Sequence, residues 1–337
     1  MPDFGVLQER WGTGADFEVG PGPAASVQSE GLHLPCDAPV LGVAWSADGR
    51  RVALACGGRI AGASGTVWVV DRAGATLRLE GHTAGTHGVA FDPATGWLAT
   101  AGHDGVLGLW DLDARRGFGV RGEVAVHRVA FTHARPWLAY AEELPAQGER
   151  AALGILDLGT GGRPWRHPLP PEHLATALAV APDATRVAFG VLRWDGAINR
   201  TCCRETPSGR PAWRRELSPE TLVHDLRWSG AGVVQSDSDG HGVRRLRVLD
   251  PRTGVERAAA RVGESVMGGL DVAGDLAASV SSEGVLVLCR LPDLSEVARV
   301  DLDGTPSMAV ALAPDRTAVA VGAADGRGLL VRALSPP

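Results

Sequence analysis

A histidine, a threonine and an aspartate fall close together in one stretch of the chain, at His82, Thr100 and Asp104. A base, a hydroxyl and a carboxylate are the groups of a hydrolytic triad, in which the histidine takes the proton of the attacking hydroxyl. Such hydrolases present the nucleophile on a strained turn between a strand and a helix, and no sequence of that kind surrounds Thr100. The stretch therefore predicts no catalytic residue.

Three further histidines raise the hypothesis of a metal site. His87, His127 and His224 each stand four residues before the residue that closes a strand-like run. Imidazole nitrogens bind zinc, but each of them must lie within about 2 Å of the ion. Whether three side chains so far apart in the sequence can meet depends on the elements that carry them.

The elements that carry these residues recur along the chain. Strand-like runs such as Val89-Ala90-Phe91 return every 40 to 49 residues, and a turn rich in Pro, Asp or Gly follows them. These residues favour tight hairpins, so each run is predicted to begin a set of antiparallel strands. The seven runs close at Trp45, Phe91, Phe131, Val180, Trp228, Val272 and Leu312.

One of these seven units resembles a repeat of the WD-repeat β-propeller family. It opens with Gly81-His82, turns at Asp104-Gly105 and closes with Trp110-Asp111. The resemblance implies an all-β fold over residues 31–334, a seven-bladed β-propeller of four-stranded antiparallel blades with degenerate, bacterial-style repeats. In that family a histidine, a hydroxyl, an aspartate and a tryptophan form a buried hydrogen-bonded set, which implies a structural role. The matching residues are His82, Thr100, Asp104 and Trp110.

Residues near the N-terminus are expected to close the ring. The last repeat leaves room for only three strands before Pro337, whereas residues 31–35 precede the first repeat as residues 77–80 precede the second. We therefore expect residues 31–35 to be the fourth strand of blade seven, which removes the open sheet edges of the array. Residues 31–334 would form a single domain. Residues 1–30 are expected to be an extension that is partly ordered, or docked on the ring or on a partner.

A ring would place the three histidines at one height near the mouth of its central channel. Blades two and five lie nearly opposite each other, so His87 and His224 are too far apart to share one zinc ion with His127. We therefore predict a polar, water-lined channel mouth, with neither a metal nor a cofactor. The other four blades place Leu41, Thr176, Gly268 and Met308 at the equivalent position.

Composition and charge argue against several kinds of partner. The net charge is −6 and the 33 basic residues are arginines scattered along the chain, whereas a protein that binds nucleic acid is expected to carry a basic face. We find no run of 18 apolar residues and no signal peptide, so neither a membrane span nor export is expected. The five cysteines lack metal-binding spacing and are expected to be buried and reduced in the cytoplasm.

The longest loops are the predicted contacts with a partner. Insertions between second and third strands fall at about residues 56–65, 141–150 and 191–199, and a Pro-rich loop at residues 166–173 joins blades three and four. The WD-repeat arrangement implies that these loops share one face of the ring. Trp and Arg are enriched at binding hot spots. The residues expected to contact a partner are Arg59, Glu142, Glu143, Arg193, Trp194 and His173.

The resemblance implies a non-catalytic protein-interaction scaffold, or a subunit of a larger assembly, that binds other proteins through the propeller face. The alternative is a propeller enzyme, or a sensor of a small ligand or metal, with its site at the central channel. An enzyme of that kind needs carboxylates, histidines or a metal at the channel mouth, and the candidates there are the three histidines alone. We therefore predict that the chain is not an enzyme.

Overall fold

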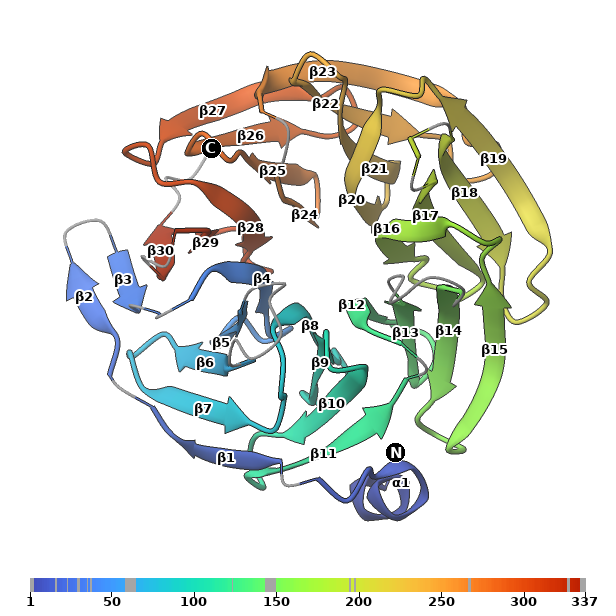
Figure 1. Cartoon of the computed structure of the whole chain (residues 1–337). Coiled ribbons are helices and arrows are strands. Elements are labelled where there is room, and N and C mark those ends of the chain that lie inside the picture. Colours follow the sequence, from blue (N-terminus) through green and yellow to red (C-terminus); the bar gives the residue numbers. More distant parts are fainter. Residues whose placement is uncertain are drawn as a thin grey trace.

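The computed structural model describes residues 3–333 apart from residues 16, 23, 29–30, 35, 37, 58–64, 123, 143–149, 194, 197, 266–267 and 326–327. Seven antiparallel units of four strands are arranged in a ring, and the chain visits them in order (Figure 1). The predicted seven-bladed all-β propeller is thereby confirmed.

Within each blade the strands lie in order from the channel to the rim. Blade one contains β4 (Val40–Trp45), β5 (Arg51–Cys56), β6 (Val67–Asp71) and β7 (Thr76–Glu80). Blade two contains β8 (Thr86–Phe91), β9 (Leu98–Gly102), β10 (Val106–Asp111) and β11 (Arg116–Arg121). Blade three contains β12 (Val126–Phe131), β13 (Trp137–Glu142), β14 (Ala152–Asp157) and β15 (Gly162–Pro168). Blade four contains β16 (His173–Val180), β17 (Arg186–Arg193), β18 (Asn199–Glu205) and β19 (Pro211–Leu217).

The remaining three blades repeat this order, and the last of them ends in a strand from the other end of the chain. Blade five contains β20 (Leu222–Ser229), β21 (Gly232–Ser238), β22 (Val243–Leu249) and β23 (Glu256–Glu264). Blade six contains β24 (Leu270–Ala273), β25 (Leu276–Val280), β26 (Val285–Arg290) and β27 (Ser295–Asp301). Blade seven contains β28 (Ser307–Leu312), β29 (Ala318–Ala323), β30 (Leu329–Ala333) and β3 (Gly31–Leu34). All seven residues predicted to close a run lie on the innermost strands.

Aspartate side chains fix several turns between first and second strands. Asp48, Asp183 and Asp315 each accept a hydrogen bond of 3.0 Å from the backbone amide two residues later. The residue between donor and acceptor has a positive φ, a conformation that glycine adopts at low cost at Gly49. All first-to-second-strand turns lie at one end of the blades, which we call the turn face. The second-to-third-strand connections lie at the opposite end, the loop face.

The core consists of seven clusters of buried apolar side chains, one between each pair of neighbouring blades. The seam between blades seven and one is packed in the same way as the other six, with Leu34 among its residues. Strand β3 pairs antiparallel with β30, with Leu32 opposite Val331. The predicted closure of the ring by the N-terminal strand is thereby confirmed.

The described part of residues 3–28 runs along the rim of the ring. Helix α1 (Phe4–Trp11) lies beside β11, β1 (Glu18–Pro21) adds to the outer edge of β7, and β2 (Ser26–Gln28) adds to β3 (Figure 1). Glu18 is also opposite Arg116 of β11, which joins the sheets of blades one and two. We call this segment the belt. The described part of the chain contains no helix whose length and apolar character would let it span a bilayer.

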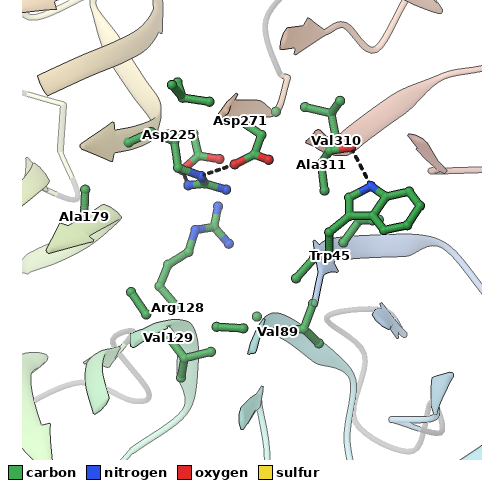
Figure 2. Close-up of a pocket in the computed structure, with 18 of the residues that line it drawn as sticks. Trp45, Val89, Arg128, Val129, Ala179, Asp225, Asp271, Val310 and Ala311 are labelled. Carbon is green, nitrogen blue, oxygen red and sulfur yellow. Dashed lines mark hydrogen bonds and ion pairs between the residues drawn. The ribbon is translucent and has the colours of Figure 1, made fainter. Parts of the chain in front are cut away.

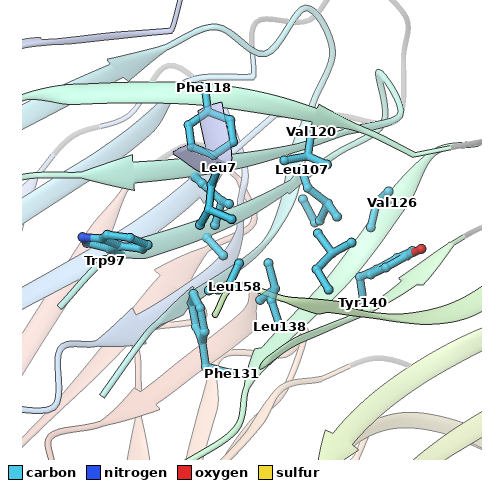
Figure 3. Packing of buried hydrophobic residues seen from close by; sticks show 14 of the residues in the cluster. Leu7, Trp97, Leu107, Phe118, Val120, Val126, Phe131, Leu138, Tyr140 and Leu158 are labelled. Atoms are coloured by element: carbon cyan, nitrogen blue, oxygen red, sulfur yellow. The ribbon is translucent and has the colours of Figure 1, made fainter. Parts of the chain in front are cut away.

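Two side chains of helix α1 enter the core between blades two and three. The ring of Phe4 packs edge-on against Trp97 and Phe118, with centroid distances of 4.9 Å to each. Leu7 is buried in the same cluster, beside Phe118 and Val120 (Figure 3). The belt is therefore part of the apolar core and not only an addition to the sheet edges.

A third anchor of the belt occupies a socket made of glycines. The ring of Phe17 lies over Gly108 and Gly119, which face each other in β10 and β11. A Cβ atom at Gly119 would come within 2.8 Å of that ring, and one at Gly81 within 2.7 Å. Glycine is unusual inside strands because it contributes no side chain to packing. Here its absence of a side chain makes room for Phe17, which is 8% exposed.

The structure joins the four residues of the blade-two signature by hydrogen bonds. The Nδ1 atom of His82 lies 3.1 Å from a carboxylate oxygen of Asp104, and its Nε2 atom lies 2.7 Å from the hydroxyl of Thr100. That hydroxyl also accepts a hydrogen bond of 3.0 Å from the indole of Trp110. Phe17 covers the set, with its ring centroid 5.0 Å from Trp110. The side chain of His82 is only 1% exposed, so no substrate can reach it.

We predict that Asp104→Asn destabilises the fold by about 2 kcal/mol at pH 7, because charge-assisted hydrogen bonds are lost. Burial by itself raises the pKa of Asp104, but hydrogen bonds from His82 and from two backbone amides lower it overall. A carboxyl whose pKa is lowered by folding stabilises the fold above its ordinary pKa of 3.8, and this contribution disappears as the pH falls through the lowered value. Urea unfolding should therefore show a smaller difference from wild type near pH 3. Asp113→Asn, at an exposed ion pair with Arg51, is the control and should have little effect.

We predict that Phe17→Ala costs about 3 kcal/mol of stability, because it empties the glycine socket and uncovers the signature set. Thermal and urea unfolding of the full chain measure this cost. Val6→Ala is the matched control, because Val6 lies on the same belt but is 58% exposed. Equal stabilities of Phe17→Ala and Val6→Ala would show that the belt does not contribute to the fold.

Candidate functional site

The innermost strands of all seven blades enclose a central channel with a cavity of about 500 Å³. Most of its wall is made of small and apolar side chains, including Val43, Val89 and Val310. Four charged residues interrupt this wall: Arg128, Asp225, Arg227 and Asp271. They come from blades three, five and six. Figure 2 labels Arg128, Asp225 and Asp271 around the cavity.

Two of these charged residues could have been found by comparing the repeats in the sequence, although the sequence analysis did not single them out. The residue before each run-closing position is alanine in five of the seven repeats, at Ala44, Ala90, Ala130, Ala179 and Ala311. Blades five and six carry Arg227 and Asp271 there instead. Aligning the repeats on these positions would have identified both as exceptions inside the channel.

Arg227 is the centre of an ion-pair group that joins three blades. Its Nε donates to Asp271 at 3.0 Å and its Nη1 donates to Asp225 at 2.6 Å. The second carboxylate oxygen of Asp271 accepts a hydrogen bond of 2.8 Å from the backbone amide of Leu312 in blade seven. Burial lowers the pKa of Arg227, but the two carboxylates raise it overall, so the guanidinium stays charged.

Arg128 approaches this group from the other side of the channel. Its side chain extends from β12 toward Asp225 and Asp271 (Figure 2). Its Nη1 also donates to the backbone carbonyl of His127 at 3.3 Å. Two guanidinium groups therefore point into the same cavity from different blades.

The three histidines predicted at the channel mouth occupy β-bulges. In six innermost strands the pairing register shifts at this position, so one residue is inserted into the strand. The ring of His87 stacks on His103 with centroids 4.1 Å apart, and Nε2 of His224 lies 2.7 Å from the hydroxyl of Ser238. Of the three histidines, His87 alone lines the channel cavity. Among the residues that the structure describes, no group of three or more His, Cys, Asp or Glu could hold a metal ion.

Two of the residues predicted to contact a partner lie inside the blades. Glu142 is fully buried, and Arg166 donates to its carboxylate at 2.9 Å. His173 is also buried, with its Nδ1 atom 2.8 Å from the carbonyl of Pro171. A carboxylate or imidazole that is removed from water needs a hydrogen-bond partner inside the protein, and both side chains have one. The expectation that Glu142 and His173 lie on the rim of the loop face is therefore wrong.

The other predicted contacts are only partly covered by the structure. Arg193 is half-exposed and forms ion pairs of 2.8 Å with Asp195 and 3.7 Å with Glu172. Arg59, Glu143 and Trp194 lie outside the described residues.

A groove on the turn face, between blades four and five, was not predicted. It has a volume of about 430 Å³ and shares two of its lining residues, Pro182 and Trp228, with the channel cavity. The hollow therefore continues from the channel mouth outward along the surface. Arg186 and Arg252 line its outer part together with Asp183. In the sequence analysis, partner contacts were expected on the longest loops. This groove is lined by short turns, so it was missed.

The comparisons with known proteins agree with this architecture. The family described as "WD domain, G-beta repeat" matches residues 75–111, which span β7 of blade one and β8, β9 and β10 of blade two. Among curated proteins, no sequence matches the chain.

Two solved structures illustrate the fold. The β-propeller domain of Cps50 (Swd1) from Myceliophteria thermophila superposes with a TM-score of 0.71 at 14% identity, covering 94% of this chain and 100% of that one. Hydrazine synthase from Kuenenia stuttgartiensis superposes with a TM-score of 0.72 at 12% identity, covering 92% and 99%. At these identities the similarity establishes the fold alone. Residues 75–111 are thus similar to a WD repeat, and the fold of the whole chain is that of a β-propeller.

Proposed function

We propose that the chain is a non-catalytic platform that holds another protein on its turn face, as a scaffold or as a subunit of a larger assembly. The observation that carries this proposal is the continuous hollow formed by the channel cavity and the groove between blades four and five, which meet at Pro182 and Trp228. An extended segment of a partner fits a hollow of this shape better than a compact small molecule does.

The chemistry of the groove supports a protein partner. Trp228 is half-buried and Arg252 is exposed, and both residue types contribute strongly to protein interfaces. Arg186 is fixed by a hydrogen bond of 2.8 Å to the carbonyl of Pro251, so the groove wall is already ordered. A surface that is ordered in advance loses little conformational entropy on binding, which favours affinity.

The burial of His82, Thr100 and Asp104 in blade two supports the proposed absence of catalysis. They are held in a buried set under Phe17, which leaves no access to substrate. One of the similar structures is an enzyme, so the fold does not by itself decide the question. The proposal includes a cytoplasmic location and a bacterial source. It also includes a protein, and not a nucleic acid, as the partner.

We predict that Arg252→Glu lowers the amount of co-purifying partner at least tenfold, because it reverses a charge at the outer part of the groove. The measurement is quantitative mass spectrometry of proteins cross-linked to the chain in its native cells. Arg50→Glu is the matched control, since Arg50 is an exposed arginine on another turn of the same face. Unfolding temperatures of both variants should stay near that of wild type.

The double variant Arg193→Ala/Trp194→Ala tests the loop face in the same experiment. If it removes the partner while Arg252→Glu does not, the partner binds the loop face and the turn-face assignment is wrong. If neither variant changes any cross-linked protein, the platform proposal itself is contradicted.

A further inference from the structure

Positive charge is spread unevenly over the turn face. The third-to-fourth-strand turns also lie at this end of the blades, because neighbouring strands run in opposite directions. On blades six, seven and one, every arginine at this end whose side chain the structure describes forms an ion pair with a carboxylate. These arginines are Arg50, Arg51, Arg72, Arg290 and Arg316. Their charges are therefore balanced within the chain.

Blades three and five carry exposed arginines at the same end that lack such partners. Arg135 lies in the first-to-second-strand turn of blade three, and Arg252 lies in the third-to-fourth-strand turn of blade five. Both are exposed, and within the described part of the chain no carboxylate forms an ion pair with either of them. The guanidinium of Arg135 lies 4.5 Å from the ring centroid of Trp137, a contact that restrains its position. This arc of the face therefore offers positive charge to a partner.

The turns that carry these two arginines meet at the groove between blades four and five. The backbone amide of Ala134, next to Arg135, donates to the carbonyl of Pro182 at 3.1 Å, and Pro182 lines the groove. At the other wall, the carbonyl of Pro251, next to Arg252, accepts a hydrogen bond of 2.8 Å from a side chain of blade four. The turns of blades three, four and five therefore form one continuous surface.

The acidic residues of these turns are held by groups of the chain itself. Asp183, which lines the groove, accepts hydrogen bonds from the amide of Thr185 at 3.0 Å and from its hydroxyl at 2.7 Å. The amide of Thr185 lowers the pKa of Asp183 most, and Arg186 adds to this effect. Asp250 accepts from two amides of its own turn and pairs with Arg257. Since two arginines and one aspartate line the groove, its net charge is positive.

We propose that the partner segment is acidic, an extended stretch rich in Asp and Glu that crosses the turn face from blade three to blade five. Its carboxylates bind Arg135 and Arg252, because a planar guanidinium group matches a carboxylate with two hydrogen bonds. Trp228, which lines the groove together with Pro182 and Pro251, packs against an apolar side chain of the same segment. This inference rests on the proposed function and specifies the chemistry of its partner.

A nucleic acid fits this surface less well than an acidic protein segment does. Proteins bind nucleic acids by neutralising many phosphates. Here the groove offers few arginines, and the whole chain carries a net charge of −6. The indole and the two prolines of the groove also provide an apolar surface that a phosphate backbone does not use.

Fluorescence anisotropy of a labelled, capped peptide with the full chain tests this inference. The peptide contains Asp and Glu around a single Leu, and a control peptide contains Asn and Gln at the same places. The acidic peptide should bind saturably, and more weakly as sodium chloride is added, whereas the control peptide should not bind. Arg135→Gln and Arg252→Gln should each weaken binding about tenfold. Arg50→Gln, at an exposed arginine that already pairs with Asp48, should leave binding unchanged.

Arg135→Lys keeps the test decisive if Arg135→Gln folds poorly without its contact to Trp137. Lysine retains the charge but not the planar geometry, so an intermediate loss of affinity is expected. The inference is overturned if both peptides bind equally, or if the double variant Arg135→Gln/Arg252→Gln binds the acidic peptide as wild type does. It is also overturned if single-stranded RNA binds more tightly than the acidic peptide with the same dependence on Arg252.

Cross-linking in the native cells separates a failure of this inference from a failure of the platform proposal. Mass spectrometry should identify a segment rich in Asp and Glu as the part of the partner that is cross-linked next to the groove. A cross-linked segment without acidic residues would overturn this inference alone. The absence of any protein cross-linked to the turn face would contradict the platform proposal itself.

Discussion

The pairing of β3 with β30 is the contact on which the rest of the ring depends. Without it, blade seven would end in an open edge and the apolar cluster between blades seven and one would lose Leu34. A ring is stable only when every blade has a neighbour on both sides, because each apolar cluster needs two sheets to enclose it. A strand near the N-terminus and the last strand of the chain therefore have to meet, although nearly the whole sequence separates them.

The sequence predicts the ring well because its signals are local and repeated. Residues such as Phe91 and Phe131 close strands at nearly constant intervals, and this spacing, together with the WD-repeat resemblance, predicts the blade boundaries and the role of residues 31–34. The contacts that the belt makes with the ring could not be predicted. Phe17 has no periodic neighbours, and its partner is the space that Gly108 and Gly119 leave empty, which no hydrophobic pattern reveals.

The candidate site was predicted in part. The position four residues before the run-closing residue, where His87, His127 and His224 stand, is a bulge in the innermost strand. Two of the four charged residues of the channel, Arg227 and Asp271, stand where five other blades have alanine. Glu142 was expected on the surface because it begins a long loop. Loop length shows where the chain leaves the sheet, but it does not show which side chains remain buried. Pairing with Arg166 keeps that carboxylate inside.

The belt makes the rim of the ring asymmetric. It adds strands to β7 and β3 and a helix beside β11, whereas no described strand adds to the outer sides of β15, β19, β23 and β27 (Figure 1). Exposed strand edges invite edge-to-edge association, and charged side chains oppose it. β23 carries Arg257, Arg261 and Glu264 along such an edge. Edge-to-edge association is thus opposed by charge on one arc of the circumference and by the chain's own N-terminal segment on the other.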